Sequence, residues 1–135
     1  MEFKVNTAFV NLTSGGIRYT HTPDEGVHAY LGGRGLNMAY LRRYLRAAGD
    51  PRDVDPLGPD NPLIFGAGML AGTIIPNAAR FNVTARSPES GILGDANCGG
   101  FFAAAMRKAG FDRLVILGRA ASPVYLFLED GKISI

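Results

Sequence analysis

Glycine constrains the fold of this chain more than any other feature, because eighteen of its 135 residues are glycine and many of them stand in short clusters. A glycine backbone adopts conformations that other residues avoid, and it lets another segment or a ligand approach closely. The glycines cluster at residues 15–16, 32–35 and 99–100, each time beside a segment of regular apolar spacing. The sequence therefore predicts short elements joined by tight turns, with several places of close backbone approach.

Length and composition indicate one globular domain. A chain of 135 residues has room for a single core. Hydrophobic residues make up 47% of the chain and charged residues 19%, which excludes a disordered chain. The net charge of +2 is too small to argue for a nucleic-acid partner. Arg42, Arg43 and Arg46 are interpreted as one solvated helix face.

No segment has the features of a membrane-spanning or exported protein. The chain lacks a run of the roughly 18 apolar residues that a membrane span needs. Its first residues are typical of a strand, not of a signal peptide. Its one cysteine, Cys98, cannot form an internal disulfide, which fits a reducing compartment. We therefore expect a cytoplasmic protein with no membrane partner.

Apolar spacing predicts an α+β fold, in which two main helices pack on a mixed, largely antiparallel sheet. Strands are expected at residues 3–10, 17–20, 63–67, 80–86, 114–117 and 124–128, and Asp130 with Gly131 predicts a hairpin turn before Ile133. Helices are expected at residues 35–48 and about 100–109, and loops at residues 21–27, 51–62 and from Ser87 to the second helix. Because the sequence stops at Ile135, at the end of a predicted strand, we expect the chain to be part of a longer protein.

The first candidate site is the glycine turn at residues 32–36, GGRGL, directly before the first predicted helix. Backbone N–H groups at a helix start can hold an anion, and glycines let the anion come close. The turn lacks the Lys-Ser/Thr pair of a nucleotide P-loop and the glycine spacing of a dinucleotide site. A tight turn that docks the helix on the sheet is the preferred interpretation, with a generic nucleotide site as the weaker hypothesis.

The second candidate is Arg80, at the start of a predicted strand after a loop. A guanidinium at a strand end can hold a phosphate through two parallel hydrogen bonds, which a lysine cannot do. The alternative is an arginine that pairs with a nearby carboxylate or is simply solvated.

The third candidate is the segment DANCGGFF at residues 95–102. Asn97 is a natural N-cap for the second predicted helix, and Gly99 and Gly100 leave the helix start bare of side chains. Bare amide groups and the helix dipole favour a phosphate there. The alternative is a capped helix whose glycines serve close packing.

The remaining reactive residues do not form a catalytic set. A lone cysteine cannot hold an iron–sulfur cluster, so Cys98 is interpreted as a non-catalytic thiol. His21 and His28 have no metal-ligand spacing with any carboxylate and are interpreted as loop residues. No nucleophile, base and oxyanion donors come together in the sequence. The residues alone predict phosphate binding and no chemistry.

Taken together, these segments resemble the N-terminal domain of the aldehyde:ferredoxin oxidoreductase family. The matching segments, in order, are GGRGL at 32–36, VDPLGPDNPLI at 54–64, AGMLAGT at 67–73, RFNV at 80–83, RSP at 86–88, NCGGFF at 97–102, KAGFD at 108–112 and PVYL at 123–126. The resemblance extends over nearly the whole chain in one order, so it is far more specific than any single glycine motif.

The resemblance implies a tungsten centre, less often molybdenum, held by two pterins whose phosphates are joined through Mg²⁺. Arg80 occupies the position of an arginine that binds the pterin phosphate. Asn97 matches a residue whose backbone carbonyl reaches the magnesium, and Gly99 matches a backbone contact to the same cofactor. Cys98 and Gly100 lie in the same cofactor-binding segment. Residues 1–135 would then be a pterin-binding N-terminal domain, incomplete relative to the family.

The full enzyme implied by the resemblance oxidises aldehydes to acids and passes the electrons to ferredoxin. Its [4Fe-4S] cluster and its acid-base residues belong to parts absent from this chain, so the chain needs the remaining domains or a partner subunit. The sequence departs from the family at Cys98, where a small hydroxyl residue is common, and at residues 74–79, which are bulkier than the family's glycine-rich loop. The bulkier loop before Arg80 and the short chain length favour the alternative, a cofactor-free assembly or scaffolding module. The substrate, the choice of metal and homo-oligomer formation stay open.

Overall fold

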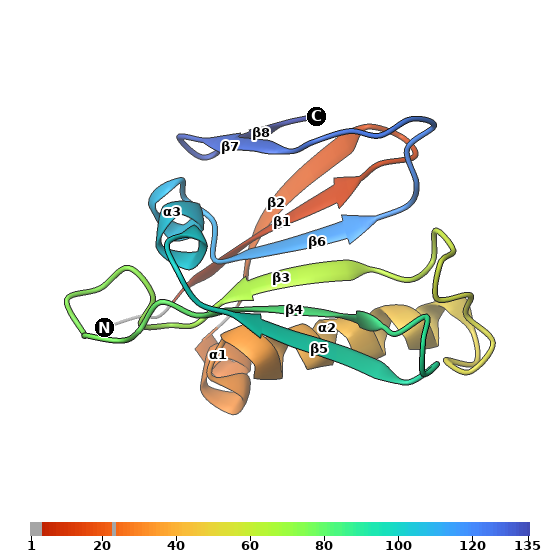
Figure 1. Ribbon diagram of the computed structural model, residues 1–135, viewed down its shortest axis with the longest axis horizontal. Helices are drawn as coiled ribbons and strands as arrows, with labels where there is room; N and C mark the ends of the chain where they lie inside the picture. Colours follow the sequence, from red (N-terminus) through yellow and green to blue (C-terminus); the bar gives the residue numbers. More distant parts are fainter. Residues whose placement is uncertain (1–3, 23) are drawn as a thin grey trace.

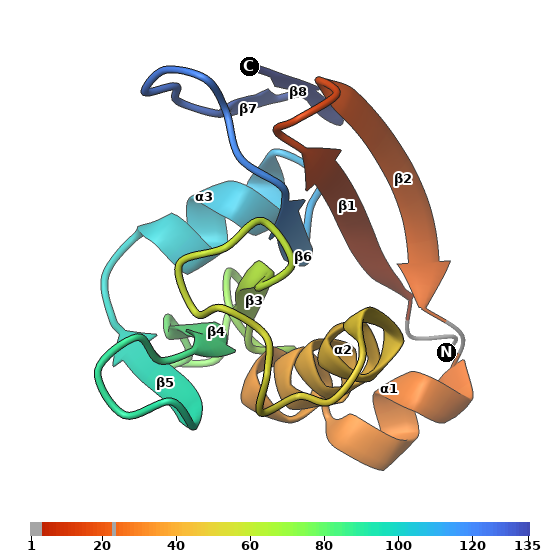
Figure 2. The same cartoon turned by 90° about the vertical axis from the view of Figure 1, so that its right-hand side faces the viewer.

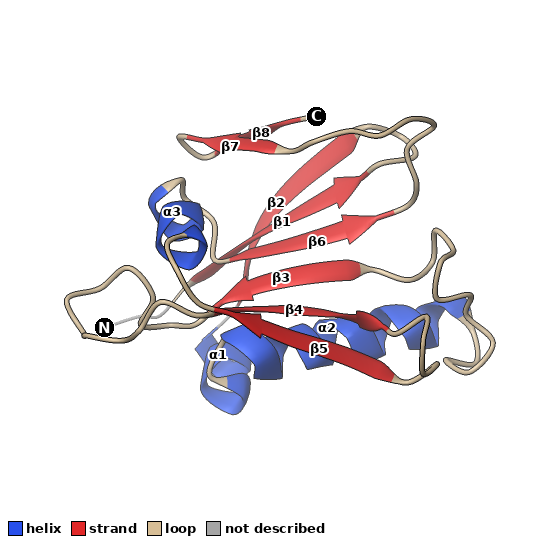
Figure 3. Ribbon diagram, in the orientation of Figure 1, coloured by secondary structure: helices blue, strands red, loops and turns tan. Residues whose placement is uncertain are grey.

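The structure, a computed structural model, describes residues 4–22 and 24–135 (Figures 1 and 3). Its elements are β1 Val5–Asn11, β2 Gly16–Thr22, α1 Asp24–Tyr30, α2 Gly33–Ala48, β3 Leu63–Ala67, β4 Phe81–Arg86, β5 Leu93–Cys98, α3 Phe102–Lys108, β6 Arg113–Leu117, β7 Phe127–Glu129 and β8 Lys132–Ser134. The described part forms a six-stranded sheet in the order β2-β1-β6-β3-β4-β5 and a separate two-stranded sheet of β7 and β8.

The main sheet is mixed and largely antiparallel, as the sequence predicts. β1 with β2, β6 with β3, β3 with β4 and β4 with β5 are antiparallel pairs, whereas β1 and β6 run parallel. A parallel pair needs a long crossover, and here the chain makes α2, β3, β4, β5 and α3 between β1 and β6. The α+β prediction is therefore confirmed.

Each face of the sheet packs against a different helix (Figure 2). On one face, Leu41 and Leu45 of α2 pack with Phe9, Ile64 and Val115 of the sheet. On the other face the buried core includes residues of α3, the sheet and β8: Ala8, Val10, Ala67, Ala71, Ala103, Met106, Phe111, Leu114 and Ile133. A strand that sends alternate side chains into two cores needs apolar residues at most positions, which explains why β1 and β6 were predicted correctly.

The sequence prediction missed two elements, α1 and β5. Residues 21–27 were expected to be a loop, but Asp24–Tyr30 forms α1, in which Val27 is buried with Val5 and Leu36. The segment after Ser87 was also expected to be a loop, but Leu93–Cys98 is the edge strand β5. Its side chains are exposed or half-buried, so no apolar alternation marks it as a strand.

The predicted boundaries differ from the observed ones at three other places. α2 begins at Gly33, two residues before the prediction, and α3 spans Phe102–Lys108. β7 spans Phe127–Glu129, because Val124 and Tyr125 are exposed and pair with no strand. The Asp130 and Gly131 turn is confirmed, since both residues have the positive φ, 45° and 75°, that such two-residue hairpins need. No helix among the described residues is long and apolar enough to span a membrane.

Candidate functional site

The structure brings Arg80 and residues 97–100 to the same end of the sheet. β4 and β5 are antiparallel, and Phe81 pairs with Cys98 and Asn82 with Asn97. Arg80 directly precedes β4 and Gly99 directly follows β5, so the two residues lie beside each other where these strands meet the loops (Figure 1). We call Arg80 and residues 97–100 the binding edge.

The Arg80 side chain is exposed and has no hydrogen-bond or ion-pair partner among the described residues. Its backbone is fixed, because its carbonyl accepts a hydrogen bond of 3.2 Å from the Gly68 N–H. The carboxylate partner considered as an alternative is therefore absent from the described part of the chain. A guanidinium that projects freely from a fixed backbone can bind an anion.

Asn97 is not the N-cap that the sequence predicts. It lies in β5, and α3 begins only at Phe102, five residues after the predicted cap. The observed cap residue, Phe101, makes no side-chain capping hydrogen bond. The Asn97 side-chain oxygen instead accepts a hydrogen bond of 3.3 Å from Asn82 of β4. The physical reason is the pairing with β4, which keeps residues 93–98 extended and moves the helix start toward Phe102.

Gly99 and Gly100 are open to solvent. A Cβ placed at either position would meet no atom within 4 Å. Gly100 has a φ of 97°, which favours glycine by itself. Gly99 has no such φ and no close neighbour, so the packing of this chain does not explain why glycine stands there. A bare backbone of this kind fits a bound group that approaches closely.

Cys98 is an exposed free thiol at the end of β5, 3.3 Å from the Gly99 carbonyl. In the part of the chain that the structure describes, no group of three or more His, Cys, Asp or Glu residues could hold a metal ion. His21 and His28 are not loop residues as expected, because they lie in β2 and α1. His21 contacts the Asn6 side chain at 2.6 Å through Nδ1.

The glycine turn at residues 32–35 reaches the same end of the sheet, where its packing accounts for its glycines. Gly32 forms an isolated β-bridge with Gly68. A Cβ at Gly35 would lie 2.5 Å from the Tyr30 carbonyl oxygen, and one at Gly32 would lie 2.9 Å from Met69 Cγ. The turn therefore docks α2 against α1 and the end of β3, as the preferred interpretation holds.

Arg34, within that turn, adds a contact that the sequence did not reveal. Its Nε lies 3.0 Å from Asp95 Oδ2 of β5. The Asp95 side chain is only 15% exposed, while that of Arg34 is 59% exposed. This ion pair joins the start of α2 to the strand that carries Asn97.

An apolar surface adjoins the binding edge. The rings of Phe65, Phe81 and Phe102 form a cluster, with the Phe81 and Phe102 centroids 4.7 Å apart. Phe101 is 92% exposed beside them, and Ile74 of the loop before Arg80 is completely exposed. Exposed apolar surface of this extent usually marks a contact with another molecule or domain.

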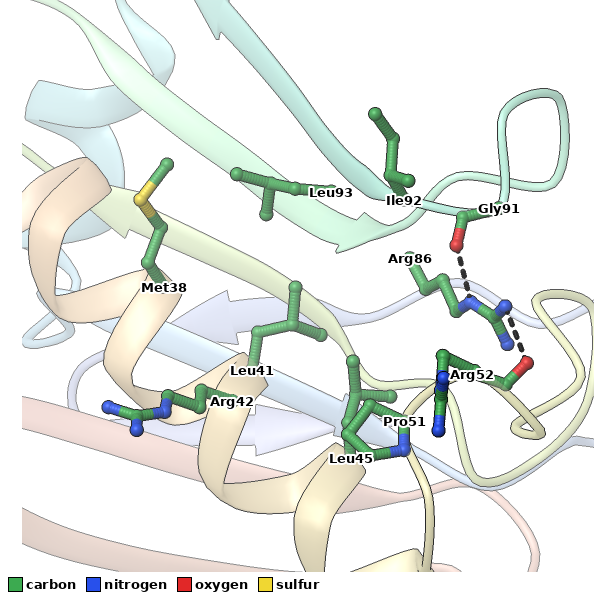
Figure 4. A pocket seen from close by; sticks show the side chains of 10 residues that line it. All are labelled: Met38, Leu41, Arg42, Leu45, Pro51, Arg52, Arg86, Gly91, Ile92 and Leu93. Carbon is green, nitrogen blue, oxygen red and sulfur yellow. Dashed lines mark hydrogen bonds between the residues drawn. The ribbon is translucent and has the colours of Figure 1, made fainter.

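An apolar pocket lies elsewhere, between α2 and the start of β5 (Figure 4). It has a volume of about 400 Å³ and is lined by Met38, Leu41, Arg42, Leu45, Pro51, Arg52, Arg86, Gly91, Ile92 and Leu93. Arg86 is not available to a ligand there, because its guanidinium donates to the carbonyls of Gly91, Val54 and Arg52. This pocket is at the opposite end of β4 from Arg80, so it is not part of the binding edge.

Comparison with known proteins points to one family. A profile of that family, "Aldehyde ferredoxin oxidoreductase, N-terminal domain", matches residues 7–135. The tungsten-containing aldehyde ferredoxin oxidoreductase of Pyrococcus furiosus is 41% identical over 126 residues, which is 93% of the chain and 20% of that enzyme. The aliphatic sulfonate oxidoreductase, WOR-like subunit, of the same organism is 31% identical over 127 residues, with the same shares of 93% and 20%.

A solved structure has the same fold. The active site complex BamBC of benzoyl coenzyme A reductase, in complex with 1,5 dienoyl-CoA, matches with a TM-score of 0.89 and 31% sequence identity. The match covers 97% of this chain and 20% of that chain. The chain thus spans about a fifth of the length of the relatives it matches.

Proposed function

Because the chain belongs to the aldehyde ferredoxin oxidoreductase family, through the N-terminal domain of that family, we propose that it forms part of the surface that holds a tungsten–pterin or molybdenum–pterin cofactor. The observation that carries this proposal is that the free guanidinium of Arg80 lies beside Gly99, a position where packing within the chain does not require glycine. The binding edge would be the contact surface, and residues 1–135 would be a cofactor-binding domain of a larger enzyme.

The residues present fit such a group. Arg80 would neutralise a pterin phosphate, since its guanidinium is exposed and has no partner in the described residues. Gly99 and Gly100 would let the cofactor approach the backbone, because no side chain or neighbouring atom fills the space above them. Asn97 would offer its backbone carbonyl to the Mg²⁺ that accompanies such a cofactor, and the exposed Cys98 thiol would lie at the rim of the same site.

When bound, the cofactor would supply the two-electron oxidation of an aldehyde to its acid. The electrons would pass through a [4Fe-4S] cluster to ferredoxin, and the cluster would lie in the remaining domains or in a partner subunit. No metal-ligating cluster is found among the described residues, so this chain would contribute binding and orientation of the cofactor. We expect the isolated chain to be inactive.

The choice of substrate would rest with the rest of the enzyme. The relatives that share this domain are named for an aldehyde, an aliphatic sulfonate and benzoyl coenzyme A. A domain retained among enzymes named for such different compounds would serve what they have in common, and a shared cofactor is the simplest common need. The binding edge, with Arg80 and Gly99, would then contact the cofactor and not the substrate.

The test measures the cofactor content of the protein purified with its natural partner domains or subunit. Tungsten and molybdenum are measured by elemental mass spectrometry, and pterin by its fluorescence after oxidation. We expect wild-type protein to contain metal and pterin, and Arg80→Ala to retain about ten- to one hundredfold less pterin, since a charged hydrogen bond contributes about 1.5–3 kcal/mol. Arg80→Lys should lie between the two, because it keeps the charge and loses the planar fork.

The matched control is Arg46→Ala, an exposed arginine in the last turn of α2, far from the binding edge. It should retain pterin like the wild type. A wild-type assembly that contains neither metal nor pterin, and in which Arg80→Ala behaves identically, would contradict the proposal. That outcome would favour the cofactor-free scaffolding module.

A further inference from the structure

A line of buried polar side chains runs beneath the binding edge. Arg113 at the start of β6, Asn37 of α2 and Asn82 of β4 are each no more than 2% exposed. The Arg113 Nε donates to Asn37 Oδ1 at 2.8 Å, and Asn37 Nδ2 donates to Asn82 Oδ1 at 3.0 Å. Asn82 Nδ2 then donates to Asp95 Oδ1 of β5. We call Arg113, Asn37, Asn82 and Asp95 the amide relay.

All hydrogen bonds of the amide relay point in one direction, from Arg113 toward β5. A guanidinium can only donate, so the side-chain oxygen of Asn37 must face Arg113 and its NH₂ group must face Asn82. A carboxylate can only accept, so the NH₂ group of Asn82 must face Asp95. The orientation of both amides is therefore fixed by their end groups, and aligned bonds of this kind strengthen one another.

The fold makes room for this relay at Gly66 of β3. A Cβ at Gly66 would lie no more than 3.0 Å from Oδ1, Cγ and Nδ2 of Asn37, so glycine lets the amide cross the strand. Arg113 also donates to the Gly33 carbonyl at 3.2 Å, and Arg34 pairs with the far oxygen of Asp95. The relay therefore ties the first turn of α2 to β6, β4 and β5 at the end of the sheet that carries the binding edge.

At its β5 end, the relay contacts residues 95–97, which shortly precede Gly99. Besides Asp95, the NH₂ group of Asn82 donates to the Ala96 carbonyl at 3.2 Å and to the Asn97 side-chain oxygen at 3.3 Å. Together with the strand pairing and the Arg34–Asp95 ion pair, these contacts hold residues 95–97 toward the α2 face of the sheet. Side chains that orient the residues contacting a bound group alter its affinity strongly even though they do not touch it.

We propose that Asn82 is a positioning residue of the cofactor site, which orients residues 95–97 so that Asn97 and Gly99 present their backbone to the cofactor. This inference rests on the proposed function of the binding edge. Asn82 itself is only 2% exposed, so it would not touch the cofactor. Its effect is transmitted through Asp95, Ala96 and Asn97.

The test is Asn82→Asp in the cofactor-loaded assembly. The substitution keeps the size of the side chain and the oxygen that accepts from Asn37 and Thr84. It replaces the NH₂ donor by an oxygen that faces the Asp95 carboxylate and the Ala96 carbonyl, so it removes only the hydrogen bonds from Asn82 to β5. We expect pterin to dissociate about tenfold faster from the folded protein, measured by the fluorescence of pterin released after dilution. The double variant Asn82→Asp/Asp95→Asn restores a donor opposite an acceptor and should recover part of the retention.

Asn61→Asp is the matched control. Asn61 bridges two segments in the same way, donating to the carbonyls of Pro56 and Arg86 at 2.7 and 2.9 Å, but it lies near the opposite end of β4. It should lower the melting temperature like Asn82→Asp and leave the pterin release rate at the wild-type value. If Asn82→Asp does not fold, Asn82→Ala, which introduces no repulsion, is compared with Asn61→Ala in the same assay.

The outcomes distinguish the positioning role of Asn82 from the proposed function of the binding edge. Faster release in the Asn82 variant than in the Asn61 variant, at equal folded fraction, supports the positioning role. Pterin retention that depends on Arg80 but not on Asn82 overturns the positioning role and leaves the proposed function intact. A wild-type assembly without pterin overturns both.

Discussion

Arg107 of α3 forms an ion pair of 2.7 Å with Asp112, and the same guanidinium donates to the carbonyls of Met69 and Ala71 at 2.6 and 2.7 Å. One half-buried arginine thus connects α3, the segment before β6 and the start of the loop that leads to Arg80. Asp112 uses its other oxygen to accept from the Asn6 N–H at 2.8 Å. The position of that loop depends on these contacts more than on apolar packing.

We therefore expect Arg107→Ala to reduce the free energy of unfolding by about 2–4 kcal/mol, because it leaves a largely buried carboxylate and two carbonyls without their donor. The measurement is urea denaturation, in which the midpoint should fall while the slope stays constant. Arg119→Ala is the control, because the Arg119 side chain is exposed and only its backbone is hydrogen-bonded. Equal midpoints for the two variants would contradict this role of Arg107.

The Arg113 and Asn37 pair should show strong coupling in a double-mutant cycle. Arg113→Met leaves the Asn37 oxygen buried without a donor, and Asn37→Leu leaves the Arg113 Nε buried without its acceptor. Each single variant should lose about 2–4 kcal/mol of unfolding free energy. The double variant should lose less than the sum of the two, because neither side chain then remains buried opposite a missing partner of this pair. Strict additivity would show that the contact contributes nothing.

The same pair predicts a pH dependence at high pH. Burial lowers the pKa of Arg113 from its ordinary value to about 10. Below about pH 9 the guanidinium is protonated in both the folded and the unfolded chain, so the stability difference between wild type and Arg113→Met should be constant. Above about pH 10 the folded protein releases the proton more readily than the unfolded chain, and the difference should shift in favour of the wild type. A shift between pH 5 and 8 would contradict this assignment.

Much of the fold could be predicted from sequence, because most strands have a buried face that shows in the apolar pattern. β3 and β4 were predicted closely, since Ile64, Asn82 and Thr84 face α2 and Phe65 and Val83 face the other side. β5 was missed because polar contacts replace apolar ones. Asp95 is held by Asn82 and Arg34, and neither contact leaves a periodic signal in the sequence.

The sequence predicts which residues form the binding edge, but it does not predict that they lie side by side. Arg80 and Gly99 were chosen for their local chemistry and for the family resemblance. Their proximity depends on the register between Phe81 and Cys98, and that register requires a strand where the sequence indicated a loop. The sequence does not indicate Asn37, Asn82 and Arg113 as buried residues that support the site, because polar residues are by default expected on the surface. An asparagine at an apolar position of a predicted helix, as at residue 37, is the signal that would have indicated a buried polar contact.

Gly99→Ala should separate binding from stability. A Cβ at this position meets no protein atom within 4 Å, and the residue lies outside the left-handed region, so the unfolding free energy should change by less than about 0.5 kcal/mol. The methyl group would nevertheless stand where the cofactor approaches the backbone, so pterin retention should fall. Gly66→Ala is the opposite case, because its Cβ would collide with the buried Asn37 amide, and it should lose about 1–3 kcal/mol of stability. Thermal unfolding and pterin content are measured on both variants in the same assembly. A Gly99→Ala protein that is as stable as the wild type and retains as much pterin would place the cofactor away from this backbone.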